Sequence, residues 1–148
     1  MIPAIHAQYV LDASVAAKWF TRHAEADRDK AIALKTLHLS GRCALIIPEF
    51  SLLEIANAIR YSERAGNEET KNALSFLEKL RLQVVPLDWD LLREATSIAF
   101  AREITVYDAT YVALAERLGF PLVTADEALT RKTAGHAQVL RLRDLDFS

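Results

Sequence analysis

The sequence predicts an α/β fold in which a mostly parallel sheet of five strands is covered by helices on both faces. Short apolar runs typical of buried strands alternate along the chain with longer segments whose apolar residues recur at helical spacing. Parallel strands need crossover connections, and the helical segments are long enough to supply them. No linker, internal repeat or low-complexity segment divides the chain of 148 residues, so we expect a single domain over residues 1–148.

Each predicted strand is a short apolar run that stops at a proline or near a polar residue. The first strand, residues 8–11, stops at Asp12, and the second, residues 43–47, stops at Pro48. The remaining strands are expected at residues 83–85, 120–123 and 138–142.

The predicted helices lie between these strands, and glycines mark several of their ends. Gly41, Gly119 and Gly135 each follow an apolar segment with helical periodicity, where a helix commonly ends. Pro48 is expected at the start of the helix that follows the second strand, because its missing N–H costs nothing there. The helices are expected to begin near Val15 and to cover residues 25–40, 49–65, 68–81, 88–103, 105–118 and 127–134.

Charge and composition exclude several classes of function. Eighteen basic and 20 acidic residues give a net charge of −2, so any contact with nucleic acid must be local. No apolar run approaches the roughly 18 residues of a membrane span, and no signal peptide is visible, so we expect a cytoplasmic protein. Cys43 is the only cysteine, which excludes an intrachain disulfide and a cysteine-based zinc site.

Two aspartates directly follow predicted strands. In open α/β sheets ligands bind beyond the carboxyl ends of the strands, which is where Asp12 and Asp126 are expected. Asp12 also has a structural explanation, because an aspartate at a strand-to-helix turn is a good helix cap. Thr124 and Glu127 match a capping box, which leaves Asp126 without a necessary structural role.

Two further acids are expected on helices. Asp108 follows Thr105 by three residues, so it belongs either to a capping box or to a functional site at the first helical turn. Glu54 lies nearly opposite the core-facing stripe of its helix, within a second apolar stripe, where its charge needs a cation or an arginine as partner. The core-facing stripe is expected to consist of Leu52, Ile55, Ala56 and Ile59.

Together, these acids have the ligand chemistry of a hard divalent cation. Asp12, Glu54, Asp108 and Asp126 come from four separate segments and supply only oxygen donors, which Mg²⁺ and Mn²⁺ prefer. The histidines show no metal-ligand spacing, which disfavours zinc. Carboxylates that gather without a cation repel one another, so function is the simplest reason for such a cluster.

The same residues resemble the PIN domain family, and most closely its VapC-type toxins. The similar stretches follow one another along nearly the whole chain. They are Leu11-Asp12-Ala13-Ser14, Pro48 with Glu54 and Asn57, Val106-Tyr107-Asp108-Ala109 with Ala113-Leu114-Ala115-Glu116, and Leu122-Val123-Thr124-Ala125-Asp126. The resemblance implies a three-layer α/β/α sandwich and a Mg²⁺- or Mn²⁺-dependent endoribonuclease. It also implies a homodimer that is inhibited by a small VapB-like antitoxin.

Carried over by position, the resemblance assigns Asp12, Glu54, Asp108 and Asp126 as metal ligands and catalytic acids. The polar groups expected to support them are Ser14, Asn57 and Thr124. Sequence-specific cleavage would take place in a single-stranded loop of a structured RNA, where the bases are splayed out.

Three other functions stay open at this point. A PIN nuclease could process RNA outside a toxin–antitoxin pair. A non-catalytic RNA-binding module could keep the fold without requiring all four acids. A receiver-like signalling domain also gathers acids at strand ends, although this chain has only one aspartate at the end of its first strand.

Overall fold

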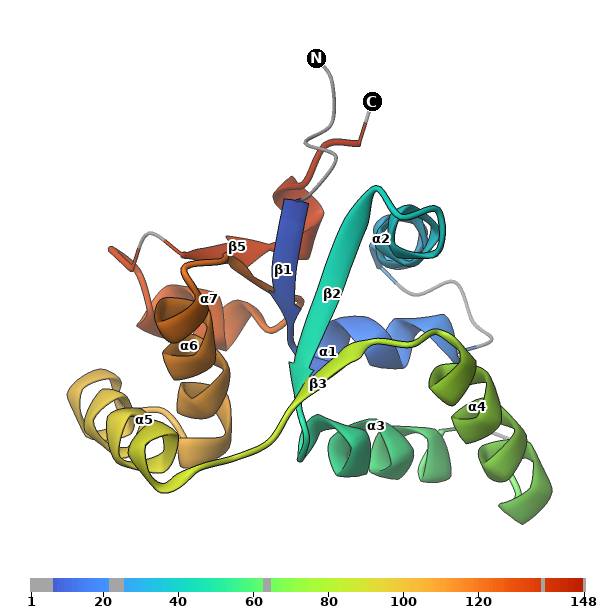
Figure 1. The fold of residues 1–148 in the computed structure, drawn as a ribbon, viewed down its shortest axis with the longest axis horizontal. Coiled ribbons are helices and arrows are strands. Elements are labelled where there is room, and N and C mark those ends of the chain that lie inside the picture. The colour runs from blue at the N-terminus through green and yellow to red at the C-terminus, as the bar shows by residue number, and fades with distance from the viewer. Residues whose placement is uncertain (1–6, 22–25, 63–64, 137, 148) are drawn as a thin grey trace.

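The computed structural model describes residues 7–21, 26–62, 65–136 and 138–147. Within them, five strands form one sheet in which every neighbouring pair is parallel, in the order β3-β2-β1-β4-β5 (Figure 1). The predicted α/β fold with five strands is therefore confirmed. The strands are β1 (Ala7–Leu11), β2 (Cys43–Pro48), β3 (Gln83–Val85), β4 (Leu122–Thr124) and β5 (Val139–Arg141).

Helices cover both faces of this sheet. They are α1 (Ala13–Ala16), α2 (Arg28–Leu39), α3 (Ser51–Arg60), α4 (Asn67–Lys79), α5 (Trp89–Arg102), α6 (Val106–Leu118) and α7 (Glu127–Lys132). Two 3₁₀ turns, η1 (Ala17–Trp19) and η2 (Leu142–Asp144), follow α1 and β5. Figure 1 shows α5, α6 and α7 on one face and α1 to α4 on the other, which makes a three-layer α/β/α sandwich. No helix in the described ranges is long and apolar enough to cross a bilayer.

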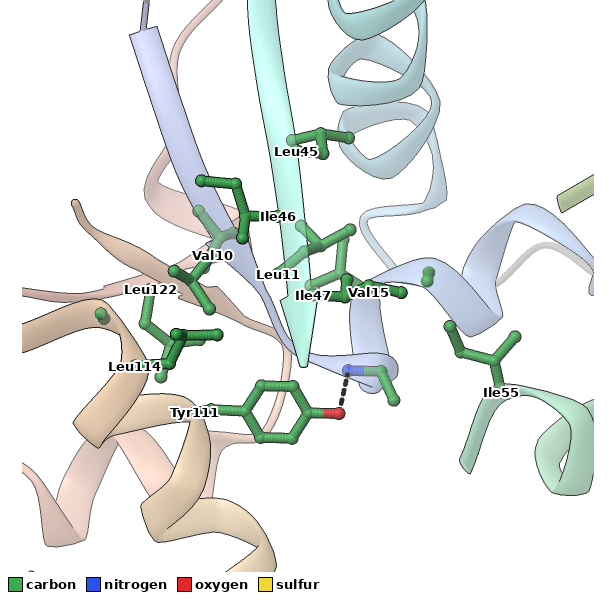
Figure 2. Packing of buried hydrophobic residues seen from close by; sticks show 14 of the residues in the cluster. Val10, Leu11, Val15, Leu45, Ile46, Ile47, Ile55, Tyr111, Leu114 and Leu122 are labelled. Atoms are coloured by element: carbon green, nitrogen blue, oxygen red, sulfur yellow. Dashed lines mark hydrogen bonds between the residues drawn. The ribbon is translucent and has the colours of Figure 1, made fainter. Parts of the chain in front are cut away.

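The middle of α6 is buried on all sides. Residues 109–115 are all buried because α6 packs between the sheet and α5. Figure 2 shows Leu114 of α6 beside Val10 and Leu122 of the central strands. This packing fixes the first turn of α6 at the edge of the sheet where the strands end.

β1 and β4 are neighbours at the point where the chain reverses its direction across the sheet. From β1 the chain proceeds to β2 and β3 on one side, and it then returns past β1 to β4 and β5 on the other. The backbone N–H of Asp12 donates to the carbonyl of Val123 at 3.0 Å, which joins the ends of β1 and β4. Such a switch point is where open α/β sheets leave a crevice for ligands.

The predicted helical position of Pro48 is wrong, because Pro48 is the last residue of β2. It pairs with Val85 of β3, whereas the pairing between β2 and β1 ends earlier, at Val10 and Ile46. The missing N–H of Pro48 therefore leaves no bond unmade on the side of β1.

The core-facing stripe predicted on α3 is only partly correct. Ile55 and Ile59 are buried and Ala56 is partly buried, but Leu52 is 36% exposed. The helix is also shorter than the predicted range 49–65. It turns a narrower apolar face to the core than the sequence pattern indicated.

Candidate active site

Asp12 lies immediately after β1 and is only 6% exposed. Its oxygen Oδ2 accepts hydrogen bonds from Ser14 Oγ at 2.8 Å and from Thr124 Oγ1 at 2.7 Å. Asp12 does occupy the N-cap position of α1, but its side chain is bound by the hydroxyls of Ser14 and Thr124, so a role as helix cap does not by itself account for it. A buried carboxylate needs such donors, and here they come from the polar residues that the sequence had placed beside it.

Ser14 and Thr124 also join the two strand ends to each other. Ser14 Oγ accepts from the backbone N–H of Ala125 at 3.1 Å, and Thr124 Oγ1 accepts from that of Asp126 at 3.0 Å. Each hydroxyl thus donates to Asp12 and accepts from the loop after β4. We call Asp12, Ser14, Thr124 and Asp126 the strand-end half of the site.

Asp126 caps α7, contrary to the prediction that it lacked a structural role. Its Oδ1 accepts from the backbone N–H groups of Ala128 at 2.9 Å and Leu129 at 3.2 Å. The predicted capping box of Thr124 with Glu127 does not form, because the Thr124 hydroxyl is bonded to Asp12 and Glu127 pairs with Arg143 at 2.8 Å.

Asp108 lies in the first turn of α6, half-buried and near Asp126. The backbone N–H of Asp108 donates to Thr105 Oγ1 at 3.1 Å, so the predicted cap at Thr105 is confirmed. Asp108 and Asp126 line one surface hollow of about 250 Å³ between the start of α6 and α7. The capping arrangement therefore leaves the Asp108 carboxylate beside a second acid.

Glu54 of α3 reaches the site through Tyr111 of α6. The Tyr111 hydroxyl donates to Glu54 Oε1 at 2.5 Å and accepts from the backbone N–H of Ala13 at 3.3 Å. Figure 2 shows Tyr111 reaching from α6 to the start of α1, directly after Asp12. Ser51 is also hydrogen-bonded to this hydroxyl. We call Glu54, Asp108 and Tyr111 the helix half of the site.

Asn57, predicted to support Glu54, is exposed on α3. Both residues belong to the described chain, and no hydrogen bond joins their side chains there. Asn57 therefore does not hold the Glu54 carboxylate, and the buried Tyr111 donates to it instead. A role for Asn57 stays a prediction.

The acids lie close enough to repel one another. Burial, followed by the charges of Asp12 and Asp126, raises the pKa of Asp108 to about 6. Burial also raises the pKa of Glu54, and the charges of Asp12 and Asp108 raise it further. The hydrogen bond from Tyr111 lowers it. Burial raises the pKa of Asp12 as well, with a further contribution from Asp126, although the Thr124 and Ser14 hydroxyls act against it.

Residues 9–135 match the family described as PIN domain. The matched range begins in β1 and ends just after α7, so it contains all four acids of the site. The chain belongs to the PIN domain family. This membership sets aside the receiver-like alternative.

Two similar proteins of Pyrobaculum aerophilum carry names that describe nucleases. Ribonuclease VapC3 is 33% identical to this PIN domain over 132 residues, which cover 83% of this chain and 92% of the relative. Exonuclease VapC9 is 34% identical over 101 residues, which cover 68% of this chain and 76% of the relative. A toxin–antitoxin complex from Klebsiella pneumoniae has the same fold, with a TM-score of 0.68 at 14% identity, and the match covers 93% of this chain and 99% of that chain.

The donor chemistry of this PIN domain fits a hard divalent cation. In the described residues, no group of three or more His, Cys, Asp and Glu side chains is arranged so that it could hold a metal ion. Four carboxylates nevertheless converge there, and three of them have raised pKa values because burial and mutual repulsion oppose their charges. A cation with oxygen ligands would remove this repulsion.

Tyr111 and Ser51 are polar residues of this PIN domain that the sequence analysis missed. Both are fully buried, and Tyr111 lies in the apolar run of α6. A tyrosine in a buried run needs a hydrogen-bond partner for its hydroxyl, and that requirement was the available signal. The identity of the partner was not predictable, because Glu54 is 57 residues away in the chain.

Proposed function

We propose that this PIN domain is a metal-dependent endoribonuclease that acts as the toxin of a toxin–antitoxin pair. The observation that carries the proposal is the convergence of Asp12, Glu54, Asp108 and Asp126 at the switch point of the sheet, where burial and the charge of at least one other acid of the set raise the pKa values of Asp12, Glu54 and Asp108. The nuclease names of two relatives support this chemistry. Mg²⁺ or Mn²⁺ is the proposed cofactor.

The four acids would hold the cation, and their neighbours would fix the direction of each carboxylate. A bound divalent cation supplies a water of lowered pKa and neutralises charge on the leaving oxygen of a phosphodiester. Ser14 and Thr124 hold Asp12 in one orientation. Tyr111, whose pKa is raised by burial and then by the charge of Asp12, stays protonated and holds Glu54.

The decisive test is cleavage of structured RNA by the purified protein with Mn²⁺, with Mg²⁺ and with chelator. We expect cleavage only with a metal, and a loss of about 10²–10³-fold in Asp108→Asn, which removes a charge with little change of shape. Asp90→Asn is the matched control, because Asp90 is also an acid in the first turn of a helix but is exposed and paired with Arg93. Cleavage that survives chelation, or equal activity in the two variants, would reject the metal-nuclease mechanism.

A circular RNA separates internal cleavage from cleavage at ends. An endoribonuclease linearises the circle. An exonuclease, the activity named for the relative VapC9, needs a free end and leaves the circle intact. Linearisation with Mn²⁺ supports the proposal. Degradation of linear RNA alone would favour an exonuclease.

The proposed partners are a small VapB-like antitoxin and a second copy of the chain. The toxin–antitoxin complex from Klebsiella pneumoniae supports the first, because its toxin and antitoxin were found together. If a short open reading frame lies next to the gene, co-expression with its product should yield a stable complex that no longer cuts RNA. Free, active protein after co-expression would instead favour an RNA-processing nuclease. We further propose that residues 1–148 form one domain and act on RNA in the cytoplasm.

A further inference from the structure

Tyr107 carries an exposed aromatic ring next to the acids. It precedes Asp108 in the first turn of α6, and 64% of its surface is exposed. The ring meets Phe50 edge-on, with centroids 5.8 Å apart and planes at 68°. Phe50 meets the buried ring of Tyr111 in the same way, at 5.3 Å and 65°. An aromatic row therefore runs from the hydrogen-bond partner of Glu54 to the surface.

This row holds the Tyr107 ring without burying it. An edge-to-face contact favours one ring orientation and leaves an aromatic face open. The hydroxyl of Thr105 caps α6, and residues from 109 onward fill the core, so neither task needs the Tyr107 side chain.

Lys132 lies near Asp108 on the side of α7. Its Nζ donates to the carbonyl of Glu103 at 3.1 Å, which places the ammonium at the hollow that Asp108 and Asp126 also line. Among the described residues that line this hollow, Lys132 has the only cationic side chain. Its charge acts on Asp108, because it lowers the pKa of that carboxyl against the effect of burial.

We propose that single-stranded RNA lies across the first turn of α6, with one base stacked on Tyr107 and a nearby phosphate bound by Lys132. This inference rests on the proposed function. Aromatic faces stack bases of any sequence, and an ammonium group binds phosphate as a point charge. A chain with a net charge of −2 needs such local contacts to hold an anion beside four carboxylates. The two contacts would set the position of the RNA backbone relative to Asp108.

The base contact is tested with short single-stranded oligonucleotides that carry one abasic nucleotide at successive positions. Tyr107→Ala should raise KM about tenfold and leave kcat unchanged, and Tyr107→Phe should stay within about twofold because it keeps the aromatic face. One abasic position should raise KM for the unmodified protein and have no further effect in Tyr107→Ala. Tyr61→Ala, which removes another exposed tyrosine, is the control.

The phosphate contact is tested through salt dependence. In Lys132→Gln the slope of log KM against log salt should fall by about 0.7, the value for one contact to a single strand. Lys79→Gln is the matched control, because Lys79 is likewise the exposed last residue of a helix. Equal slopes in both variants would show that Lys132 only caps the end of α5.

Binding separates this inference from the proposed function. Fluorescence anisotropy of a labelled oligonucleotide in Ca²⁺ measures binding independently of cleavage. Binding that weakens in Tyr107→Ala, without any cleavage by the unmodified protein, would support the RNA path and reject the nuclease. Cleavage with no change in KM or in abasic sensitivity would reject the path and keep the nuclease. Absence of both binding and cleavage would reject both proposals.

Sedimentation completes the test, because a second copy of the chain could also cover Tyr107. Tyr107→Ala could convert a dimer to monomers, with a KM that returns to that of the unmodified protein at high protein concentration. The ring would then belong to a contact between protomers. That result would overturn the base platform.

Discussion

The strand-end half and the helix half of the site are held in place by different means. In the strand-end half, hydroxyls of Ser14 and Thr124 donate to Asp12, and backbone N–H groups bind the same hydroxyls and Asp126. In the helix half, a tyrosine hydroxyl holds Glu54, and Asp108 is half-buried near the charges of Asp12 and Asp126. The first half is organised by hydrogen bonds, whereas the second is left with electrostatic strain.

The difference teaches which part of the site needs a cation. Hydrogen bonds to a buried carboxylate compensate part of its lost hydration, so Asp12 can keep its place in the apo protein. Asp108 has weaker compensation, and its repulsion from Asp12 and Asp126 is relieved by protonation or by metal. We expect changes in the strand-end half to cost stability and activity together, and changes in the helix half to depend on pH and metal.

The largest loss of stability is expected from Thr124→Val. The substitution removes a donor to Asp12 and the acceptor of the Asp126 N–H at a fully buried position. It should cost about 2–3 kcal/mol of unfolding free energy, because one of the lost bonds is to a charge, and about 10–100-fold in activity. Urea unfolding and cleavage rates measure both.

Thr133→Val is the matched control for this prediction. Thr133 is 1% exposed, but its hydroxyl donates to the helix carbonyl of Leu129 and not to an acid. We expect a cost below about 1 kcal/mol and unchanged activity. Equal losses in the two variants would remove the special role of the strand-end half.

Tyr111→Phe should have the next largest effect. It leaves the Ala13 N–H without its acceptor and Glu54 without its donor, at a cost of about 1–2 kcal/mol. The Tyr111 bond lowers the pKa of Glu54, so its loss should shift the acidic limb of the activity profile to higher pH. Tyr61→Phe, at an exposed position, should change neither quantity. A loss of stability with no shift of the acidic limb would show that Tyr111 has only a structural role.

The pH dependence of the apo protein probes the helix half directly. The folded-state pKa of Asp108 is raised from 3.8 to about 6, so the folded state binds a proton more tightly than the unfolded state. The contribution of Asp108 to the unfolding free energy is therefore largest below about pH 4, and it declines as the pH rises to about 6. Asp108 is half-exposed and screened by solvent, so we expect a decline of about 1 kcal/mol.

Thermal unfolding in chelator at pH 4.5 and 7.5 measures this decline, and Asp108→Asn isolates the contribution of Asp108. The variant should lose less stability over this range than the unmodified protein. Mn²⁺ should restore stability to the unmodified protein at pH 7.5. A larger loss in Asp108→Asn would contradict the sign of the effect.

The position of the acids was predictable where it depended on local sequence. Asp12 and Asp126 follow apolar runs, and parallel strands end at a common edge, so their proximity followed from the order of the elements. The role of Thr105 as a helix cap followed from its position three residues before Asp108 in the sequence. The fold was predictable for the same reason, because strands and helices have short periods.

The hydrogen-bond partners were less predictable, because they depend on long-range packing. Thr124 had a local alternative in the capping box, but its burial beside Asp12, 112 residues away in the chain, favoured the carboxylate. The same competition gave the cap of α7 to Asp126 instead of Thr124. Local rules describe what a side chain can do, and tertiary packing selects among the possibilities.

The smallest change in stability, and the sharpest separation of structure from function, is expected for Asp126→Asn. Asn and Asp cap helices about equally well, so the unfolding free energy should change by less than about 0.5 kcal/mol, whereas Asp126→Ala should cost about 1 kcal/mol. The Asn variant nevertheless removes a charge that raises the pKa of Asp12 and Asp108. It should therefore lower the pKa of Asp108 and weaken Mn²⁺ binding by calorimetric titration. Unchanged Mn²⁺ affinity would show that Asp126 serves only as a cap, and the metal would then belong to the other three acids.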